Sequence, residues 1–148
     1  MKYQSTKTYG HDVGLSACFR QWRATSHCKH LHGYALAVSL KFEADELDAN
    51  NWVVDFGGLR SFRTWLETMF DHKTLVANDD PKINTFERLH KEGLIRMKRV
   101  PNVGCEAFAA MIAEACADWL FDTRQAPRVR LVSVEVREHG ANSAIVLL

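Results

Sequence analysis

The chain has 148 residues, of which 47% are hydrophobic and 25% are charged, proportions typical of an ordinary globular protein. The 19 basic residues nearly balance the 18 acidic ones, and a formal net charge of +1 excludes an electrostatic nucleic-acid binder. No apolar run is long enough to span a membrane, and the first residues lack the apolar core of an export signal, so we expect a cytoplasmic protein. This length predicts a single domain over residues 1–148.

The hydrophobic pattern predicts elements in the order strand, strand, helix, helix, strand, strand. The expected elements are a strand region at 4–22 broken by glycines, a strand at 32–43, helices at 58–70 and 104–122, and strands at 129–138 and 144–148. Between the helices, residues 78–100 are less regular, with a short helix near 82–92 and an extended stretch after it. Strands at each end with helices between them predict an α+β fold, a four-stranded antiparallel sheet with two main helices on one face.

The segment just before the second strand holds three imidazoles and one thiol within six residues. Side chains two apart on a strand point the same way, so an extended lead-in would place Cys28, His30, His32 and Tyr34 together on the core-facing side. Such a set is typical of a metal site or of a nucleophile with its base.

Three imidazoles in this segment could supply zinc ligands, namely His27, His30 and His32. A catalytic zinc ion needs three protein ligands, and neutral imidazole is a common one. The alternative is that one or two of them only make hydrogen bonds or face solvent. Cys28 is the candidate nucleophile or acid/base, because nearby imidazoles and basic side chains favour its thiolate. The other three cysteines form no CxxC pair and are expected to be buried thiols.

Carboxylates at three other places fit a site. Asp71 and His72 directly follow the first helix, where an acid can orient an imidazole as a general base; alternatively, they only end the helix. Glu138 lies an even number of residues from the apolar valines of the strand at 129–138, so its side chain would point to the same side, into a buried or cleft-facing site. A carboxylate there needs a partner, such as the guanidine-like edge of a heterocycle. Glu106 is either a surface charge at a helix start or a second anchor for the ligand.

Taken in order, these pieces resemble the 6-pyruvoyl-tetrahydropterin synthase / 6-carboxy-tetrahydropterin synthase (QueD) family. The matching pieces are Leu15-Ser16-Ala17, Cys28 with Leu31-His32-Gly33, Val53 to Leu59, Phe70-Asp71-His72, Glu106, and Val134 to Glu138. They cover most of the chain, and the ordered set is specific although each piece alone is weak.

The resemblance implies the tunnelling fold (T-fold), in which three subunits close their sheets into a barrel and two trimers stack into a hexamer. It also implies active sites at subunit interfaces, 7,8-dihydroneopterin triphosphate as substrate, and zinc on the side-chain oxygens of that substrate. By position, Cys28 resembles the catalytic cysteine, Asp71 and His72 resemble the pair that tunes it, and Glu138 resembles the carboxylate that holds the pterin ring.

The function implied by this resemblance is a lyase that makes 6-carboxy-tetrahydropterin on the way to queuosine and other 7-deazaguanine compounds. Arg23 or Lys29, beside the cluster, would meet the triphosphate. The alternatives are the pyruvoyl-forming synthase, which eliminates triphosphate, a metal-free pterin- or purine-binding protein without catalysis, and a structural zinc knuckle.

The chain departs from the family pattern at the metal site. The family usually has His-Gly-His and one further histidine on the first strand. Here Tyr34 takes the second position of the pair, and the first-strand position falls at Phe19 or Cys18. Residues 78–100 are also a longer connection than usual, which could cover the site or alter the assembly.

Three interpretations of the metal site follow. We expect a rebuilt zinc site, in which His32 acts with His27, His30 or His11. Alternatively, Tyr34 is an unusual ligand or a hydrogen-bond donor that replaces one. In the third interpretation no catalytic metal binds, and proton chemistry relies on side chains alone.

Overall fold

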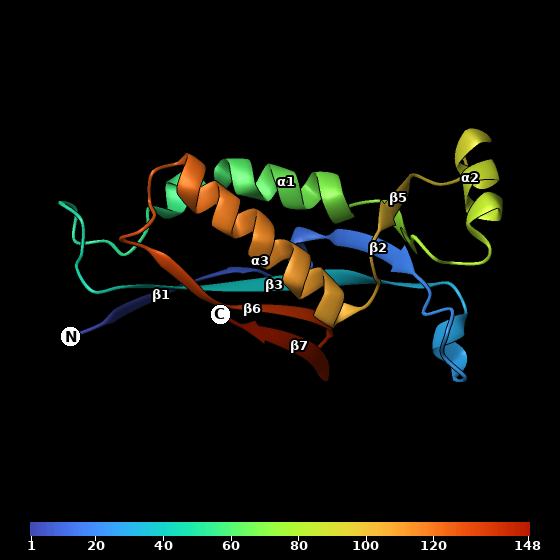
Figure 1. The fold of residues 1–148 in the computed structure, drawn as a ribbon, viewed down its shortest axis with the longest axis horizontal. Helices are drawn as coiled ribbons and strands as arrows, with labels where there is room; N and C mark the ends of the chain where they lie inside the picture. The colour runs from blue at the N-terminus through green and yellow to red at the C-terminus, as the bar shows by residue number, and fades with distance from the viewer.

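The computed structural model describes residues 1–148 as a twisted sheet with helices over one face (Figure 1). Its strands are β1 (Tyr3–Tyr9), β2 (Leu15–Phe19), β3 (His32–Ala44), β4 (Lys73–Ala77), β5 (Met97–Val100), β6 (Arg130–His139) and β7 (Asn142–Leu147). Its α-helices are α1 (Arg60–Phe70), α2 (Ile83–Lys91) and α3 (Cys105–Asp122), and short 3-10 helices are η1 (His11–Val13), η2 (His27–Lys29) and η3 (Phe56–Leu59). No helix combines the length and apolarity that crossing a membrane requires.

The sheet is organised around β3, the longest strand. β2 pairs antiparallel with the first part of β3 and β1 with the second part, so both lie along the same edge. The break between them contains η1 and Gly14, whose φ of 77° is a left-handed conformation that glycine adopts without strain. On the other edge β3 pairs with β6, and β6 pairs with β7, all antiparallel. The predicted α+β architecture is confirmed, with α1 and α3 side by side over one face (Figure 1).

Residues 73–100 form a β-α-β unit that extends this sheet. β4 pairs parallel with β2 at Ala17 and Cys18, and β5 pairs parallel with β4, which gives seven strands where the sequence predicted four. The short helix and the extended stretch in this segment were predicted and are present as α2 and β5. β4 was missed because a five-residue buried parallel strand has no alternation to distinguish it from a loop.

The core lies between the sheet and the helix pair α1 and α3. Phe62, Leu66 and Phe70 of α1 are buried four residues apart, as the predicted amphipathic helix requires. On α3, the predicted core cysteines Cys105 and Cys116 are both buried. These residues belong to one cluster of 30 buried hydrophobic side chains, so the helix pair fixes the position of the sheet beneath it.

A bulge changes the parity of β6. The pairing of β3 with β6 shifts between Lys41 and Phe42, so Leu131 rather than Val132 is buried against the helices. The predicted inward position of Val132 is therefore wrong. The alternation resumes beyond the bulge, where Val134 and Val136 are fully buried.

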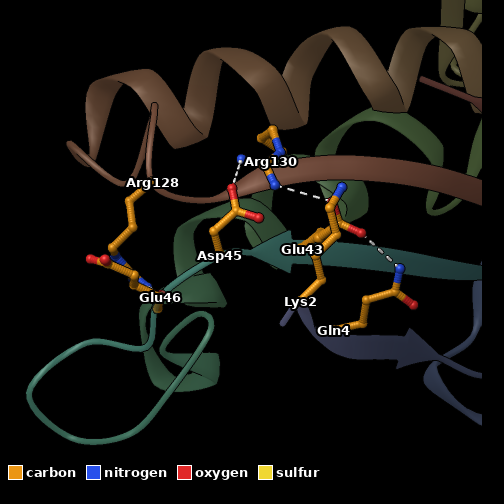
Figure 2. Close-up of polar contacts among 7 residues, drawn as sticks. All are labelled: Lys2, Gln4, Glu43, Asp45, Glu46, Arg128 and Arg130. Atoms are coloured by element: carbon orange, nitrogen blue, oxygen red, sulfur yellow. Dashed lines mark hydrogen bonds and ion pairs between the residues drawn. The ribbon is translucent and has the colours of Figure 1, made fainter.

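The face of the sheet away from α1 and α3 carries a charged network around Glu43 (Figure 2). The Glu43 carboxylate, whose side chain is 11% exposed, accepts hydrogen bonds from Lys2 Nζ at 2.9 Å, Gln4 Nε2 at 3.1 Å and Arg130 Nη2 at 3.1 Å. Arg130 also pairs with Asp45 at 3.0 Å. The hydrogen bonds from Lys2, then Gln4 and Arg130, lower the pKa of Glu43 from 4.5 to about 2. The network ties the start of the chain to β3 and β6.

Candidate functional site

Cys28 lies in the turn η2 and not on the strand. β3 begins at His32, so the extended lead-in expected before it is absent. Ser26 Oγ accepts a hydrogen bond from the Cys28 N–H at 3.3 Å, and the Cys28 carbonyl accepts one from the Gln21 N–H at 2.9 Å. Cys28 and His30 therefore do not share a strand face with His32, and the prediction from alternation was wrong for both.

Glu138 lies beside Tyr34 and Cys105, where α3 begins. Burial raises the pKa of the Tyr34 phenol, and the nearby Glu138 carboxylate and the sulfurs of Cys28 and Cys105 raise it further. Burial likewise raises the pKa of the Cys105 thiol to about 12, with further contributions from Glu138 and Glu106. Because these charges act over short distances, Cys28 and Glu138 both lie near Tyr34, and Glu106 and Glu138 both lie near Cys105. Cys105 was missed because the sequence shows it only as part of a helix core.

Three rings contact one another on the helix-covered face, and we call Phe19, His32 and Tyr34 the aromatic triad. In the pairing of β2 with β3, Phe19 lies directly opposite His32, and Tyr34 follows two residues later on the same face. The ring centroids of Phe19 and His32 are 5.2 Å apart, those of His32 and Tyr34 5.5 Å, and those of Phe19 and Tyr34 6.1 Å. Gly33 allows β2 and β3 to pair closely at this point, since a Cβ there would lie 2.8 Å from the Ala17 carbonyl oxygen.

The residues at this place do not fit a zinc ion. No group of three or more His, Cys, Asp or Glu side chains lies close enough together to hold a metal. His27 and His30 are exposed around η2, and His11 bonds to the Ala35 carbonyl through its Nδ1. His32 donates its Nδ1–H to the His30 carbonyl at 2.7 Å, which leaves only Nε2 free. The structure does not bring together the predicted set of His27, His30 and His32.

Asp71 and His72 form a hydrogen-bonded pair at the end of α1. His72 donates its Nδ1–H to Asp71 Oδ1 at 2.8 Å, and the same oxygen accepts the Ser16 N–H at 3.2 Å. Burial opposes ionisation, but the hydrogen bonds from His72 and Ser16 hold the pKa of Asp71 below its ordinary value. His72 has a φ of 54°, an uncommon conformation for a residue with a side chain, and its imidazole is 77% exposed. The pair is thus oriented, with His72 Nε2 free for a proton.

A cavity of about 740 Å³ opens beside His72. Its walls come from β2, β3, the start of β4 and the loop 93–96 that follows α2. Lys73 and Arg96 are among its lining residues, and no Asp or Glu is. The Thr74 N–H donates to the Arg96 carbonyl at 2.9 Å, which fastens the loop to β4, while the Arg96 guanidinium has no ion-pair partner. This cavity suits an anionic ligand. No sequence pattern pointed to Arg96, which lies in the least regular segment of the chain.

The family model for 6-pyruvoyl tetrahydropterin synthase matches residues 11–147. The chain belongs to this family. Among solved structures, an uncharacterized protein from Wolinella succinogenes is 22% identical with a TM-score of 0.80, covering 99% of this chain and 98% of the other. The 6-pyruvoyl tetrahydropterin synthase of Plasmodium falciparum is 16% identical with a TM-score of 0.70, covering 98% and 96%. The same enzyme from Caenorhabditis elegans is 16% identical with a TM-score of 0.59, covering 99% and 94%.

These identities are too low to show more than a shared fold, and no curated protein matches the chain in sequence. The match confirms the suspected family, and the neighbours confirm its fold. Residues 78–100, which the sequence analysis set apart as a longer connection, hold α2 and β5.

Within one chain of this 6-pyruvoyl tetrahydropterin synthase family member, Cys28 is remote from the Asp71–His72 pair. The pair is fastened to Ser16 at the start of β2, whereas Cys28 is fastened to Gln21 beyond the end of the same strand. Three extended steps from Ser16 to Phe19, roughly 10 Å at 3.3 Å each, and a turn over the next two residues separate these anchors. No hydrogen bond joins the thiol to the pair. Within one chain the thiol and the Asp71–His72 pair are therefore not in contact.

Of the two basic residues near η2 considered for the triphosphate, Arg23 is already paired, whereas Lys29 is exposed without an ion pair. Arg23 Nη2 lies 2.6 Å from Asp79 Oδ2, and its guanidinium stacks on the Trp22 ring at 4.2 Å. Arg23 is therefore less available for a phosphate group than the sequence suggested. Arg96 and Lys73 are the basic residues that line the cavity instead.

Proposed function

We propose that this chain is a lyase acting on 7,8-dihydroneopterin triphosphate. The observation that carries this proposal is Glu138, a half-buried carboxylate with no Lys or Arg partner. A carboxylate in that position is best satisfied by a ligand with two adjacent N–H donors, as on the guanidine-like edge of a pterin. Glu106, at the start of α3, is the second candidate contact for the ring.

Proton transfer is assigned to Cys28 and to the Asp71–His72 pair of a neighbouring subunit. Asp71 holds one nitrogen of His72, so the other can accept or return a proton. Cys28 is partly exposed and, like Glu138, lies near Tyr34, so a substrate bound to that carboxylate would present its side chain toward the thiol. Separation of the thiol from the pair within one chain favours sites formed between subunits of a trimer or hexamer.

The triphosphate end of the substrate is assigned to the cavity beside His72. Lys73 and Arg96 supply positive charge there, and Arg96 has no acidic partner. Arg96 comes from the loop after α2, so the longer connection contributes to the site.

The leading product is 6-carboxy-tetrahydropterin, a precursor of queuosine and other 7-deazaguanine compounds, and 6-pyruvoyl-tetrahydropterin is the alternative. Zinc chemistry forms no part of this proposal, because the donor set does not fit the ion. The same misfit favours a second candidate, a pterin- or purine-binding protein that retains the pocket without turnover.

Incubation of the purified protein with 7,8-dihydroneopterin triphosphate, followed by mass spectrometry of the products, tests the proposal. Formation of either tetrahydropterin by the wild type and not by Cys28→Ala is the expected result. Tight neopterin binding without product would support the binding protein instead. Neither binding nor turnover would refute both.

A further inference from the structure

The aromatic triad lies where the family pattern has histidines. The register of β2 and β3 places Phe19, His32 and Tyr34 on one face, with their rings in mutual contact. Zinc in proteins is held by thiolate, imidazole and carboxylate groups. Of the three side chains only His32 offers one of these groups. The rings of Phe19 and Tyr34 therefore occupy the space in which the other metal ligands would have to lie.

Neighbouring side chains cannot complete the set without a rearrangement of the core. Phe19 is 3% exposed and packs edge-on against Phe108 with centroids 5.1 Å apart, so its ring is fixed between the sheet and α3. His27 and His30 are exposed around η2, and no group of three possible ligands is present. An ion beside His32 would have one imidazole and no adequate partners.

Tyr34, in contrast, is suited to act on Glu138. Its ring is held by His32 at 5.5 Å and by His139, the neighbour of Glu138, at 6.0 Å. The pairing of Val38 with Val136 puts Tyr34 and Glu138 on the same face of the paired strands β3 and β6. A phenol that donates to one carboxylate oxygen fixes the rotamer of that carboxylate and leaves its other lone pairs for a ligand.

We infer that Tyr34 takes the place of the metal centre in this chain, as a hydrogen-bond donor that positions Glu138, and that the site binds its ligand without a metal ion. The inference rests on the proposed function for the identity of that ligand, a pterin. The absence of a zinc site rests on the triad alone.

Zinc binding tests the metal part independently of turnover. The full-length wild type, incubated with excess zinc sulfate and desalted, should retain far less than the one zinc per chain typical of a catalytic site. Phe19→His/Tyr34→His restores three imidazoles at the triad and should retain about one zinc per chain, with a zinc-dependent rise in Tm. Phe19→Leu/Tyr34→Phe, which adds no ligand, is the matched control. About one zinc per wild-type chain, lost in His32→Ala, would overturn the inference, as would a folded double-histidine variant that binds none.

A double-mutant cycle on neopterin affinity tests the positioning role. Tyr34→Phe should raise the neopterin Kd by about tenfold, the effect of one hydrogen bond to a charged group, with no change in zinc content. In a Glu138→Gln background the same substitution should change the Kd little, because the carboxylate that Tyr34 positions is gone. Equal effects in both backgrounds would show that Tyr34 acts only through packing. Lack of product from dihydroneopterin triphosphate would refute the proposed lyase and leave these binding results intact.

Discussion

The Arg20–Asp80 ion pair should be a main anchor of the β4-α2-β5 unit, and Asp80→Asn tests it. Asp80 is 1% exposed and accepts two hydrogen bonds from Arg20, at 2.8 Å from Nε and 2.7 Å from Nη2. It also accepts the Lys82 N–H at 2.8 Å, just before α2. Burial alone would raise the pKa of Asp80, but Arg20 and the Lys82 N–H hold it below its ordinary value. One carboxylate thus connects the end of β2 to the inserted helix.

The size of the effect follows from burial. Removing one partner of a buried pair costs 3–5 kcal/mol, and since Arg20 is still 21% exposed we expect the lower end, about 3 kcal/mol. Asp79→Asn is the matched control, because Asp79 and Arg23 pair at 2.6 Å with 47% and 57% of their side chains exposed. An exposed pair contributes at most about 1 kcal/mol.

Urea unfolding of the two variants and the wild type measures both values from the midpoint and slope of each transition. We expect Asp80→Asn to lower the free energy of unfolding by about 2 kcal/mol more than Asp79→Asn does, which is the difference between the two values above. Losses that agree within the error of the extrapolation would refute the argument that burial makes this pair an anchor.

Three further predictions concern the site and the sheet. Glu138→Gln should raise the neopterin Kd by tenfold or more, on the order expected for a charged hydrogen bond, and an unchanged Kd would remove Glu138 from the site. Arg96→Gln should weaken binding of inorganic triphosphate and not of neopterin, with Arg99→Gln, on the following strand β5, as a control that changes neither; equal losses in both variants would point to general charge. Because the pKa of Glu43 is lowered from 4.5 to about 2, its network contributes fully above pH 4.5 and loses this contribution as pH falls toward 2. In Glu43→Gln, Tm should therefore decrease less than in the wild type as pH falls through that range. An equal decrease of Tm with pH in both proteins would contradict this role.

The sequence predicted the elements whose periodicity is long and regular. α1 and α3 carry apolar residues at steady helical spacing, and β3 alternates over most of its 13 residues. Elements without such a period were missed or misplaced. β4 is short and buried, and the bulge beside Phe42 shifts the parity of Leu131 in a way that no local pattern reveals.

The candidate site divides in the same way. Asp71 and His72 were predicted as a pair because they are adjacent in sequence, and the structure joins them by a hydrogen bond. The three imidazoles near Cys28 are just as close in sequence, but the turn η2 separates them in space. Tertiary contact, which alternation does not encode, decides which of these residues share a site.

The distance between Cys28 and the Asp71–His72 pair makes a final prediction about assembly. If each active site takes Cys28 from one subunit and His72 from its neighbour, Cys28→Ala and His72→Ala chains should be inactive alone and active together. In a random one-to-one mixture, a site has intact residues on both sides with a probability of one half times one half, so co-refolded chains should recover about a quarter of wild-type activity. Native mass spectrometry would confirm that the oligomers contain both variants. Mixed oligomers without activity would show that both residues must come from the same chain, and the separation between their anchors, Ser16 and Gln21, would then have to be closed by a conformational change.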